Sequence, residues 1–122
     1  MTFPSINYKF NDLAEAQALT ELIEKKCEAF SKYLHDNDAV TCEIEFQKVA
    51  PQQNGQVHQV EANLQINGTL YRAVATEETF EKAIDEVRDE LDKELRTAKE
   101  KQVTRDKQAG REAKEMMMEA QV

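Results

Sequence analysis

An apolar stripe in the second half of the sequence constrains the fold most. The stripe repeats in steps of three or four residues and consists of Phe80, Ile84, Val87, Leu91 and Leu95. That spacing is one face of an α-helix and excludes a β-strand. Thr76 can cap its start, and no glycine or proline interrupts it before Gly110. We therefore predict a helix over residues 77–111, about 50 Å long at ~1.5 Å per residue, which a small sheet cannot cover.

The charge of this predicted helix changes along its length. The chain as a whole has a net charge of −8, but residues 93–114 hold eight basic residues against four acids. The basic residues are Lys93, Arg96, Lys99, Lys101, Arg105, Lys107, Arg111 and Lys114. We predict that the first half of the helix packs on the core and the second half projects as a basic arm. Such an arm can face a polyanion, or it can be a solvated helix without a partner.

Composition bounds the remaining possibilities. At 122 residues the chain can form one domain with one core. It has no apolar stretch of about 18 residues, so we expect no membrane span. It also has no apolar run behind a basic start, so we expect no secretory signal. We therefore expect a cytoplasmic protein. Cys27 and Cys42 lack metal-type spacing, which predicts buried reduced thiols and no metal or cofactor. His35 and His58 have no paired nucleophile, which argues against an enzyme.

The other elements follow from shorter patterns. Alternating apolar and polar residues predict four strands, at about residues 6–10, 40–47, 60–66 and 69–75. Between the first two strands a helical period appears at Leu19, Leu22, Ile23, Cys27, Phe30 and Leu34. Asp12 and Glu15 resemble a capping box at the start of this helix, and a polar turn follows it from His35 to Asp38.

The dipeptide Asn67-Gly68 is favoured in two-residue type I′ hairpins and predicts the strand register. The expected pairs are Ile66 with Thr69, Leu64 with Tyr71, Ala62 with Ala73 and Val60 with Ala75. One sheet face is then apolar, while the other is acidic and polar and unsuited to nucleic acid. Packing both helices on the apolar face gives a two-layer α/β sandwich with the order β-α-β-β-β-α.

We expect the chain to divide at the end of this fold. Residues 1–110 would form the α/β domain with its protruding helix, and residues 111–122 a charged, methionine-rich tail. A faint stripe of Ala113, Met116, Met117 and Ala120 continues into the tail. It can serve a protein partner or self-association, because methionine suits adaptable contacts, or it can be a frayed terminus.

Several stretches of the sequence, taken together, resemble those of a known protein family. The stretches are Ala73-Val-Ala75, Thr79-Phe-Glu-Lys-Ala-Ile-Asp85 with its basic continuation, Lys25-Lys26 and Lys32-Tyr33. Over about residues 5–101 the chain resembles the ribosome hibernation promoting factors and ribosome-associated translation inhibitors, also known as the sigma-54 modulation protein family. The chain ends where short members of that family end, so we expect it to lack the separate dimerisation domain of the long form.

The resemblance implies a fold similar to a double-stranded-RNA-binding domain and a non-enzymatic role. Members bind the small ribosomal subunit in the decoding groove and stop translation in starved or stationary cells. Basic residues of both helices grip ribosomal RNA (rRNA) phosphates. The rRNA-binding residues expected here are Lys25, Lys26, Lys32, Lys93, Arg96, Lys99, Lys101 and Arg105.

Acidic residues mark where this chain departs from the family. Glu81 replaces a usual tyrosine and Glu90 a common lysine, and Asp89 and Asp92 add further negative charge. A carboxylate facing a phosphate is repelled instead of releasing a counterion. The alternative function is therefore a regulatory protein-interaction module that keeps the fold but has lost rRNA binding, and that uses its acidic surface or its tail on a protein partner.

Overall fold

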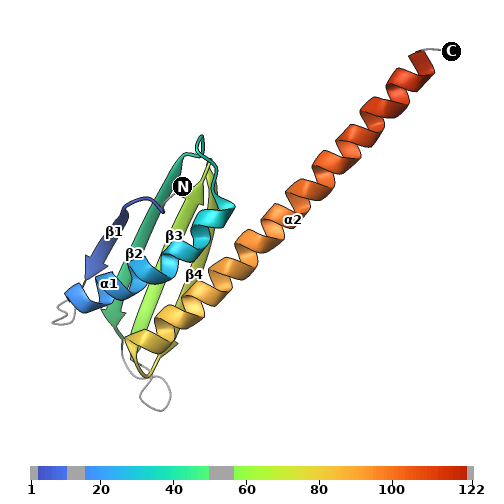
Figure 1. The fold of residues 1–122 in the computed structure, drawn as a ribbon. Coiled ribbons are helices and arrows are strands. Elements are labelled where there is room, and N and C mark those ends of the chain that lie inside the picture. The colour runs from blue at the N-terminus through green and yellow to red at the C-terminus, as the bar shows by residue number, and fades with distance from the viewer. Residues whose placement is uncertain (1–2, 11–15, 50–56, 121–122) are drawn as a thin grey trace.

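Four strands form one layer of the molecule and the helices form the other (Figure 1). The computed structural model describes residues 3–10, 16–49 and 57–120, without the side chains of residues 16 and 115–120. In chain order the elements are β1 (Ile6–Phe10), α1 (Ala16–Cys27), the 3-10 helix η1 (Glu28–Tyr33), β2 (Val40–Lys48), β3 (His58–Ile66), β4 (Thr69–Glu77) and α2 (Phe80–Ala120). The predicted fold class and element order are confirmed.

The sheet has the strand order β1-β2-β3-β4, so β1 and β4 form its two edges. β1 is parallel to β2, and the other neighbours are antiparallel. Asn67 and Gly68 have positive φ angles of 50° and 87°, as the type I′ turn requires at both central residues. The predicted register of the β3–β4 hairpin is confirmed at every pair from Ile66–Thr69 to Val60–Ala75.

Asn67 also anchors the hairpin to the rest of the sheet. Its side-chain oxygen accepts a hydrogen bond from the Ala39 amide at 2.8 Å, and its side-chain NH₂ donates to the Asp38 carboxylate at 2.8 Å. Its own backbone N–H donates to the Ala39 carbonyl at 2.8 Å. The residue that permits the left-handed turn therefore also fixes the segment that enters β2.

The core lies between the apolar face of the sheet and the helices. The predicted stripe of α2 is buried throughout, from Phe80 at 5% exposed to Leu95 at 3%. On the first helix, Leu19, Ile23, Cys27, Phe30 and Leu34 are buried as well. After Leu95 only Ala98 is half-buried, and every described side chain from 99 to 114 is exposed. The second half of α2 therefore projects beyond the sheet, as predicted (Figure 1).

The start of α2 differs from the prediction. Thr76 belongs to β4, where its hydroxyl accepts a hydrogen bond from Gln59 at 3.2 Å. The cap is Thr79, whose hydroxyl accepts from the Lys82 backbone N–H at 3.1 Å. The prediction was wrong because the β3–β4 pairing continues to Glu77, and a residue held in a ladder cannot take the N-cap position.

The first helix also differs from the prediction. It was expected to run as one helix to about Leu34, but it tightens after Cys27 into η1, a common ending for an α-helix. Its expected capping box, Asp12 with Glu15, lies outside the described residues. α2, by contrast, continues through Gly110 to Ala120, since a single glycine costs a helix only about 1 kcal/mol. Whether residues 111–122 act as a separate tail stays a prediction.

Leu91→Ala should destabilise the fold. Leu91 is 2% exposed at the contact of α2 with the sheet, and truncating a core leucine costs about 2–5 kcal/mol. Thermal unfolding followed by circular dichroism measures the effect. The matched control is Val103→Ala on the projecting part of the same helix, where Val103 is 45% exposed. An equal loss in both variants, or none in either, would contradict the assignment of the buried face.

Candidate nucleic-acid interface

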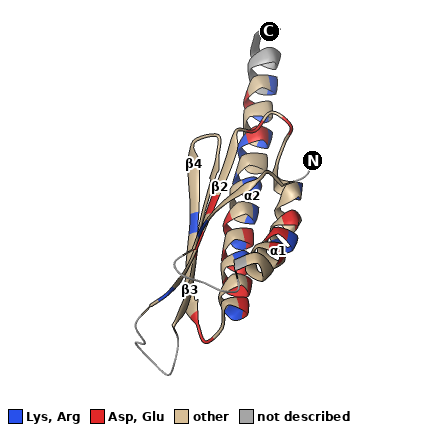
Figure 2. Ribbon diagram, turned by 90° about the vertical axis from the view of Figure 1, so that its left-hand side faces the viewer, with Lys and Arg blue, Asp and Glu red and all other residues tan. Residues whose placement is uncertain are grey.

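The predicted basic residues of α2 begin at Lys93, at the end of the part that packs on the sheet, and continue along the projecting part. Lys93, Arg96, Lys99, Lys101 and Arg105 are all exposed. Figure 2 shows blue basic segments continuing along α2 beyond the sheet. The helix itself positions these side chains, because it is one continuous element from Phe80 to Ala120. Their charges are thus carried on one continuous helix, whose first half is packed in the core.

A junction between η1 and α2 brings basic residues from both elements together. The Tyr33 hydroxyl donates a 2.8 Å hydrogen bond to the Asp92 carboxylate, which lies 59 positions away in the sequence. The Lys32 ammonium lies 5.1 Å from the centre of the Tyr33 ring, and the Lys99 ammonium lies 6.0 Å from it. Both distances suit cation–π attraction. We call Lys32, Tyr33, Asp92 and Lys99 the Tyr33 junction.

The electrostatics of the Tyr33 junction favour its hydrogen bond. Burial raises the pKa of Tyr33, and the hydrogen bond to Asp92 raises it further, while the charge of Arg96 opposes this. A phenol with a raised pKa keeps its proton at neutral pH and can go on donating to the carboxylate. Lys32 and Lys99 therefore both lie near a neutral ring, and Arg96 is close enough for its charge to act on that ring.

The other two basic residues of the first helix are placed differently. Lys26 forms an ion pair with Asp85 on α2 at 2.8 Å. The hydrogen bond from Lys26 holds the pKa of Asp85 below its usual value, and the charges of Lys26 and Arg88 add to this effect. Lys25 is exposed and has no ion-pair partner among the described residues. Lys26 thus joins α1 to α2, whereas Lys25 remains available to an external partner.

The four acidic residues at which this chain departs from the family have different surroundings in the structure. Asp92 accepts the Tyr33 hydrogen bond, and Asp89 pairs with Arg88 at 2.9 Å. Glu81 and Glu90 are exposed on α2. Sequence reasoning treated Asp92 only as a charge that weakens phosphate binding and missed its role as the partner of Tyr33. The one available signal was the Lys32-Tyr33 pair, but its partner lies too far away in the sequence to be inferred from spacing.

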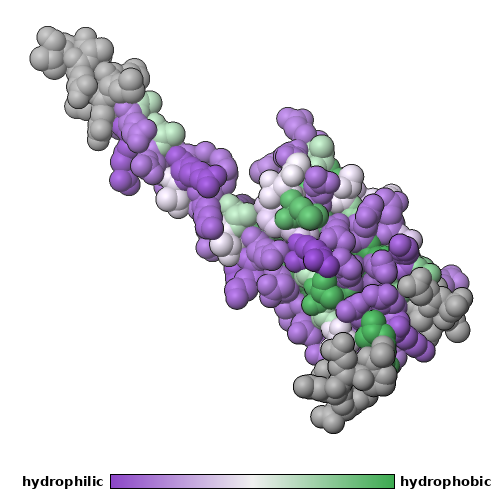
Figure 3. Space-filling model, turned by 180° about the vertical axis from the view of Figure 1, so that it is seen from behind, coloured by the Kyte–Doolittle hydropathy of each residue, from purple (hydrophilic) through white to green (hydrophobic). Residues whose placement is uncertain are grey.

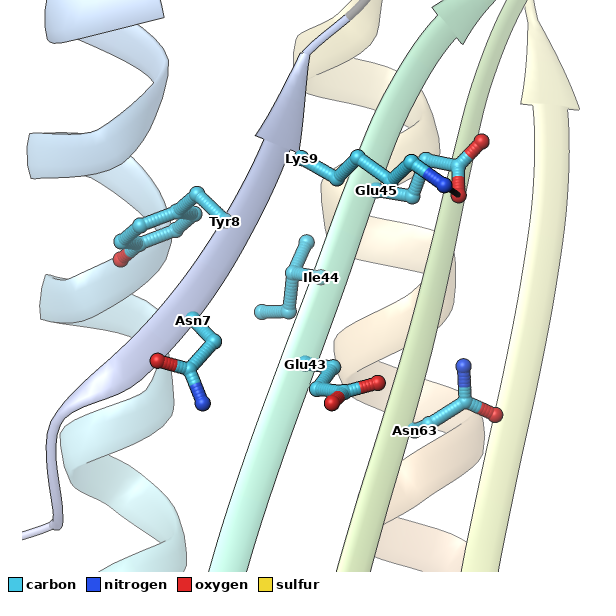
Figure 4. A pocket seen from close by; sticks show the side chains of 7 residues that line it. All are labelled: Asn7, Tyr8, Lys9, Glu43, Ile44, Glu45 and Asn63. Atoms are coloured by element: carbon cyan, nitrogen blue, oxygen red, sulfur yellow. Dashed lines mark ion pairs between the residues drawn. The ribbon is translucent and has the colours of Figure 1, made fainter.

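The outer face of the sheet is poorly suited to binding phosphates. Figure 3 shows a largely hydrophilic surface there, with separate hydrophobic spots. A shallow pocket of about 370 Å³ lies over β1 and β2, and its polar side chains include Asn7, Lys9, Glu43 and Glu45 (Figure 4). The ammonium of Lys9 lies 4.0 Å from the Glu45 carboxylate. With two carboxylates around its one cation, this pocket is unsuited to a polyanion, so the candidate interface is confined to the helical side.

The described residues hold neither a cluster of metal-ligating side chains nor a helix suited to a membrane. Within ranges 3–10, 16–49 and 57–120, no group of three or more His, Cys, Asp or Glu is placed to hold a metal ion. In the same part of the chain, no helix is long and apolar enough to cross a membrane. Cys27 and Cys42 are free and buried, as predicted, and burial raises the pKa of each thiol to about 12.

Carboxylates spaced four residues apart form a stripe along one flank of α2, the acidic stripe of Glu86, Glu90 and Glu94. A hydrogen bond to the Glu77 carboxyl raises the pKa of Glu86, and burial and the charges of Glu77 and Glu90 raise it further. Burial raises the pKa of Glu94, with Glu90 adding to it. Each shift means that the ionised form is disfavoured in the folded chain.

Glu86→Gln should therefore stabilise the protein near neutral pH. The pKa of Glu86 in the folded chain lies above its ordinary value of 4.5, so the protonated carboxyl favours the folded state. This stabilisation is fully present below pH 4.5 and is lost as the pH rises through the folded pKa. We expect a higher melting temperature for the variant at pH 7 and none of this gain at pH 4. Glu112→Gln, on the exposed arm, is the control. A gain for Glu86→Gln that is the same at both pH values would contradict the raised pKa of Glu86.

Comparisons with known proteins agree with this geometry. Two solved structures share the fold: the Thermus thermophilus Protein Y N-terminal domain and a ribosomal subunit interface protein from Coxiella burnetii. The first is 18% identical with a TM-score of 0.61, and the match covers 73% of this chain and 91% of that one. The second is 24% identical with a TM-score of 0.58, and the match covers 77% and 96%.

None of the curated protein sequences compared with the chain matches it significantly. The family model described as Sigma 54 modulation protein / S30EA ribosomal protein, in contrast, matches residues 6–103. This range begins at β1 and reaches into the projecting half of α2, so it includes the whole sheet and the Tyr33 junction. The chain therefore belongs to the sigma-54 modulation protein / S30EA ribosomal protein family, as the sequence resemblance indicated.

Proposed function

We propose that this protein is a ribosome-binding stress factor, which occupies the decoding groove of the small subunit and inhibits translation. The observation that carries the proposal is the projecting half of α2. It is a continuous helix whose basic side chains are all exposed, on a chain that is acidic as a whole. Membership of a family whose description includes a ribosomal protein supports the same function.

The distribution of the basic residues suits insertion into a groove. Lys93, Arg96, Lys99, Lys101 and Arg105 follow one another in steps of three, three, two and four residues, so they wind around the helix. A flat surface would engage only one side of such an arm, whereas a groove presents phosphates to several sides. Contacts of this kind position the protein on rRNA without reading base sequence.

The Tyr33 junction supplies basic charge at the base of the arm. The ammonium groups of Lys32 in η1 and Lys99 in α2 lie 5.1 Å and 6.0 Å from the centre of the Tyr33 ring, so cations from two elements are close to this point. Lys26 contributes less, because its charge is already paired with Asp85 at 2.8 Å. We place Lys25 at the periphery of the interface. The acidic body repels RNA from other directions and favours approach through the arm.

The role we propose is non-enzymatic and cytoplasmic, and it needs no cofactor. A protein that blocks a groove requires affinity and shape but no reacting group. The interface described above holds lysines, arginines and one hydrogen-bonded tyrosine, which are residues of phosphate recognition.

A protein-interaction module is the second candidate function. It is favoured by Glu81 and Glu90, which are exposed on α2 and have no ion-pair partner among the described residues. Carboxylates in this state repel phosphates and suit a basic protein surface. The two candidates differ in one observable, which is whether the protein sediments with the small ribosomal subunit.

Replacing Arg96, Lys99 and Lys101 together by glutamate should abolish sedimentation with the small subunit and relieve inhibition of translation in a cell-free system. The reason is that each reversal removes a phosphate contact and adds repulsion. For the unaltered protein, log affinity should fall linearly with log salt, by about one unit per phosphate neutralised. Sucrose-gradient sedimentation at several salt concentrations measures both effects.

The matched control is the triple variant Lys9→Glu, Lys48→Glu and Lys82→Glu. It changes the net charge by the same amount, but at exposed positions of the sheet and of the first turn of α2. We expect it to sediment with the small subunit as the unaltered protein does. If the arm variant still binds with unchanged salt dependence, or the unaltered protein never binds, the ribosomal function is wrong and the interaction module replaces it.

Deleting residues 112–122 tests the proposed tail. The deletion should change oligomeric state or capture of a protein partner while leaving the melting temperature unchanged, because the described side chains there, 112–114, are exposed. Met116 and Met117, which motivated this prediction, have side chains outside the described part. Light scattering and pull-down assays check it. Identical species before and after deletion would mean that the tail is no contact surface.

A further inference from the structure

The two edges of the sheet differ in how they are protected. β1 is five residues long, follows Pro4 and carries the exposed Lys9. β4 is nine residues long and pairs with β3 at every position without a bulge. Short strands, proline, bulges and lysines are the usual means of keeping an edge from pairing with another chain. β1 has three of these features, whereas β4 is long, regular and open.

The hairpin register identifies the free backbone groups of β4. In a two-residue hairpin the residues flanking the turn, Ile66 and Thr69, form a hydrogen-bonded pair. Hydrogen-bonded and non-hydrogen-bonded pairs then alternate along the ladder. Leu70, Arg72 and Val74 therefore direct their backbone N–H and C=O groups away from β3, toward the open edge. These are the groups that an added strand would pair with.

The side chains beside this edge are apolar on the outer face of the sheet. Leu70 is 57% exposed and Val74 is 44% exposed, and the only other large hydrophobic side chain exposed in the described chain is Val103. Arg72 lies between them, but its guanidinium turns inward to the Glu61 carboxylate of β3 at 2.9 Å. The charge on this face is thus directed away from the edge and does not block it.

The helical side of the same edge is a groove with acidic side chains. A hollow of about 630 Å³ lies between β4 and α2, and its lining includes Leu70, Tyr71, Glu90 and Glu94. Glu86 continues the acidic stripe toward the end of β4, where its carboxyl meets that of Glu77. No cation among the described residues pairs with the acidic stripe, and mutual repulsion helps to raise the pKa of Glu86 and Glu94.

Lys101 lines the other end of the groove, beside the start of β4, and Lys93 lies between Glu90 and Glu94 along the helix axis. The groove is therefore basic near Thr69 and mainly acidic toward Glu77. A strand laid along β4 would need its cationic side chains opposite the acidic stripe, on the side facing α2. Its alternate side chains would lie beside Leu70 and Val74 on the outer face.

We propose that the open edge of β4 binds an extended segment of a partner protein, which adds a fifth strand to the sheet. The segment carries apolar side chains on one side, against Leu70 and Val74, and lysine or arginine on the other, against the acidic stripe. Main-chain hydrogen bonds give such strand addition its affinity, and alternate side chains give it specificity. This binding centres on the β4 edge, shares only Lys93 and Lys101 with the proposed rRNA interface, and does not depend on rRNA binding.

Charge favours a basic segment over a second copy of this chain as the occupant. A second copy would bring its own acidic stripe to the same edge, with Lys101 only at one end. A segment whose facing side chains are all basic meets the carboxylates of the acidic stripe with attraction.

The test uses the full-length ¹⁵N-labelled protein and a nine-residue peptide that alternates valine with lysine. We expect the peptide to shift the amide signals of Leu70, Arg72 and Val74 in a saturable titration. Val74→Pro removes one open-edge N–H without removing a bond to β3, which is a tolerated place for proline. It should weaken binding by at least about tenfold while the hairpin stays folded.

A second variant covers the case in which Val74→Pro does not fold. Glu90→Lys with Glu94→Lys lies on the helix surface and should weaken binding by about tenfold through lost attraction and added repulsion. Its matched control is Glu100→Lys with Glu112→Lys on the arm, which changes the net charge equally and should bind as the unaltered protein does.

Control peptides separate strand pairing from general attraction to an acidic protein. The same peptide with all its backbone amides N-methylated keeps its charge, has no N–H to donate and carries methyl groups along both edges, so it should not bind. A peptide that alternates valine with glutamate should bind weakly. Equal binding of any of these peptides, or amide shifts confined to the arm, would overturn the proposal. So would a concentration-dependent dimer of the protein that Val74→Pro abolishes, because the occupant would then be a second copy.

Discussion

The packing of one face of α2 on the sheet is the contact on which the rest of the structure depends. Phe80, Ile84, Val87, Leu91 and Leu95 are at most 5% exposed, and burying each such side chain stabilises the fold by roughly 1.5–3 kcal/mol. This contact fixes the direction of the helix, and the helix then continues after the sheet has ended. Nucleation is the costly step of helix formation. Since the core has already nucleated α2, the projecting half needs only the smaller contributions of its own residues, such as the bond from Gln102 to Asp106 at 3.0 Å.

Charge follows the same division of α2. In the packed half, carboxylates join elements: Asp85 receives Lys26 of α1, and Asp92 receives Tyr33 of η1. These contacts hold the first helix against the second and so place Lys32 and Lys99 near the same Tyr33 ring. In the projecting half, basic residues predominate and are exposed. Acids that weaken phosphate binding by their charge can thus support it through geometry, because they hold in place the elements that carry the basic residues, and preorganisation lowers the cost of binding.

The two sheet edges and the two sides of the sheet give the molecule separate surfaces for separate partners. The helical side bears the basic arm and the Tyr33 junction, and the outer face is polar with its own internal ion pairs, as between Arg72 and Glu61 at 2.9 Å. β4 lies between these surfaces with unpaired backbone groups. A partner on β4 and a nucleic acid on the arm would share Lys93 and Lys101, which line the groove. Val74 belongs only to the β4 edge and Arg105 only to the arm, so variants at these residues can alter the two bindings independently.

Much of this architecture is determined by local sequence pattern. Asn67-Gly68 specifies the hairpin register because only residues that tolerate positive φ fit both turn positions, and the structure has both angles positive. The stripe from Phe80 to Leu95 specifies the buried face of α2, since the helical period allows no other element. The loss of that stripe after Leu95 and the change of charge determine the exposed basic arm.

Contacts between distant residues were decided only by the tertiary structure. Thr79 rather than Thr76 caps α2, because pairing with β3 extends β4 to Glu77. Asp92 became the partner of Tyr33, and Asp85 that of Lys26, because the sheet holds both helices on one face. The groove beside β4 exists only where α2 crosses that strand. Periodicity and turn chemistry act over a few residues, so the sequence alone determines elements and faces, whereas pairing across 59 residues, as between Tyr33 and Asp92, depends on how those faces meet.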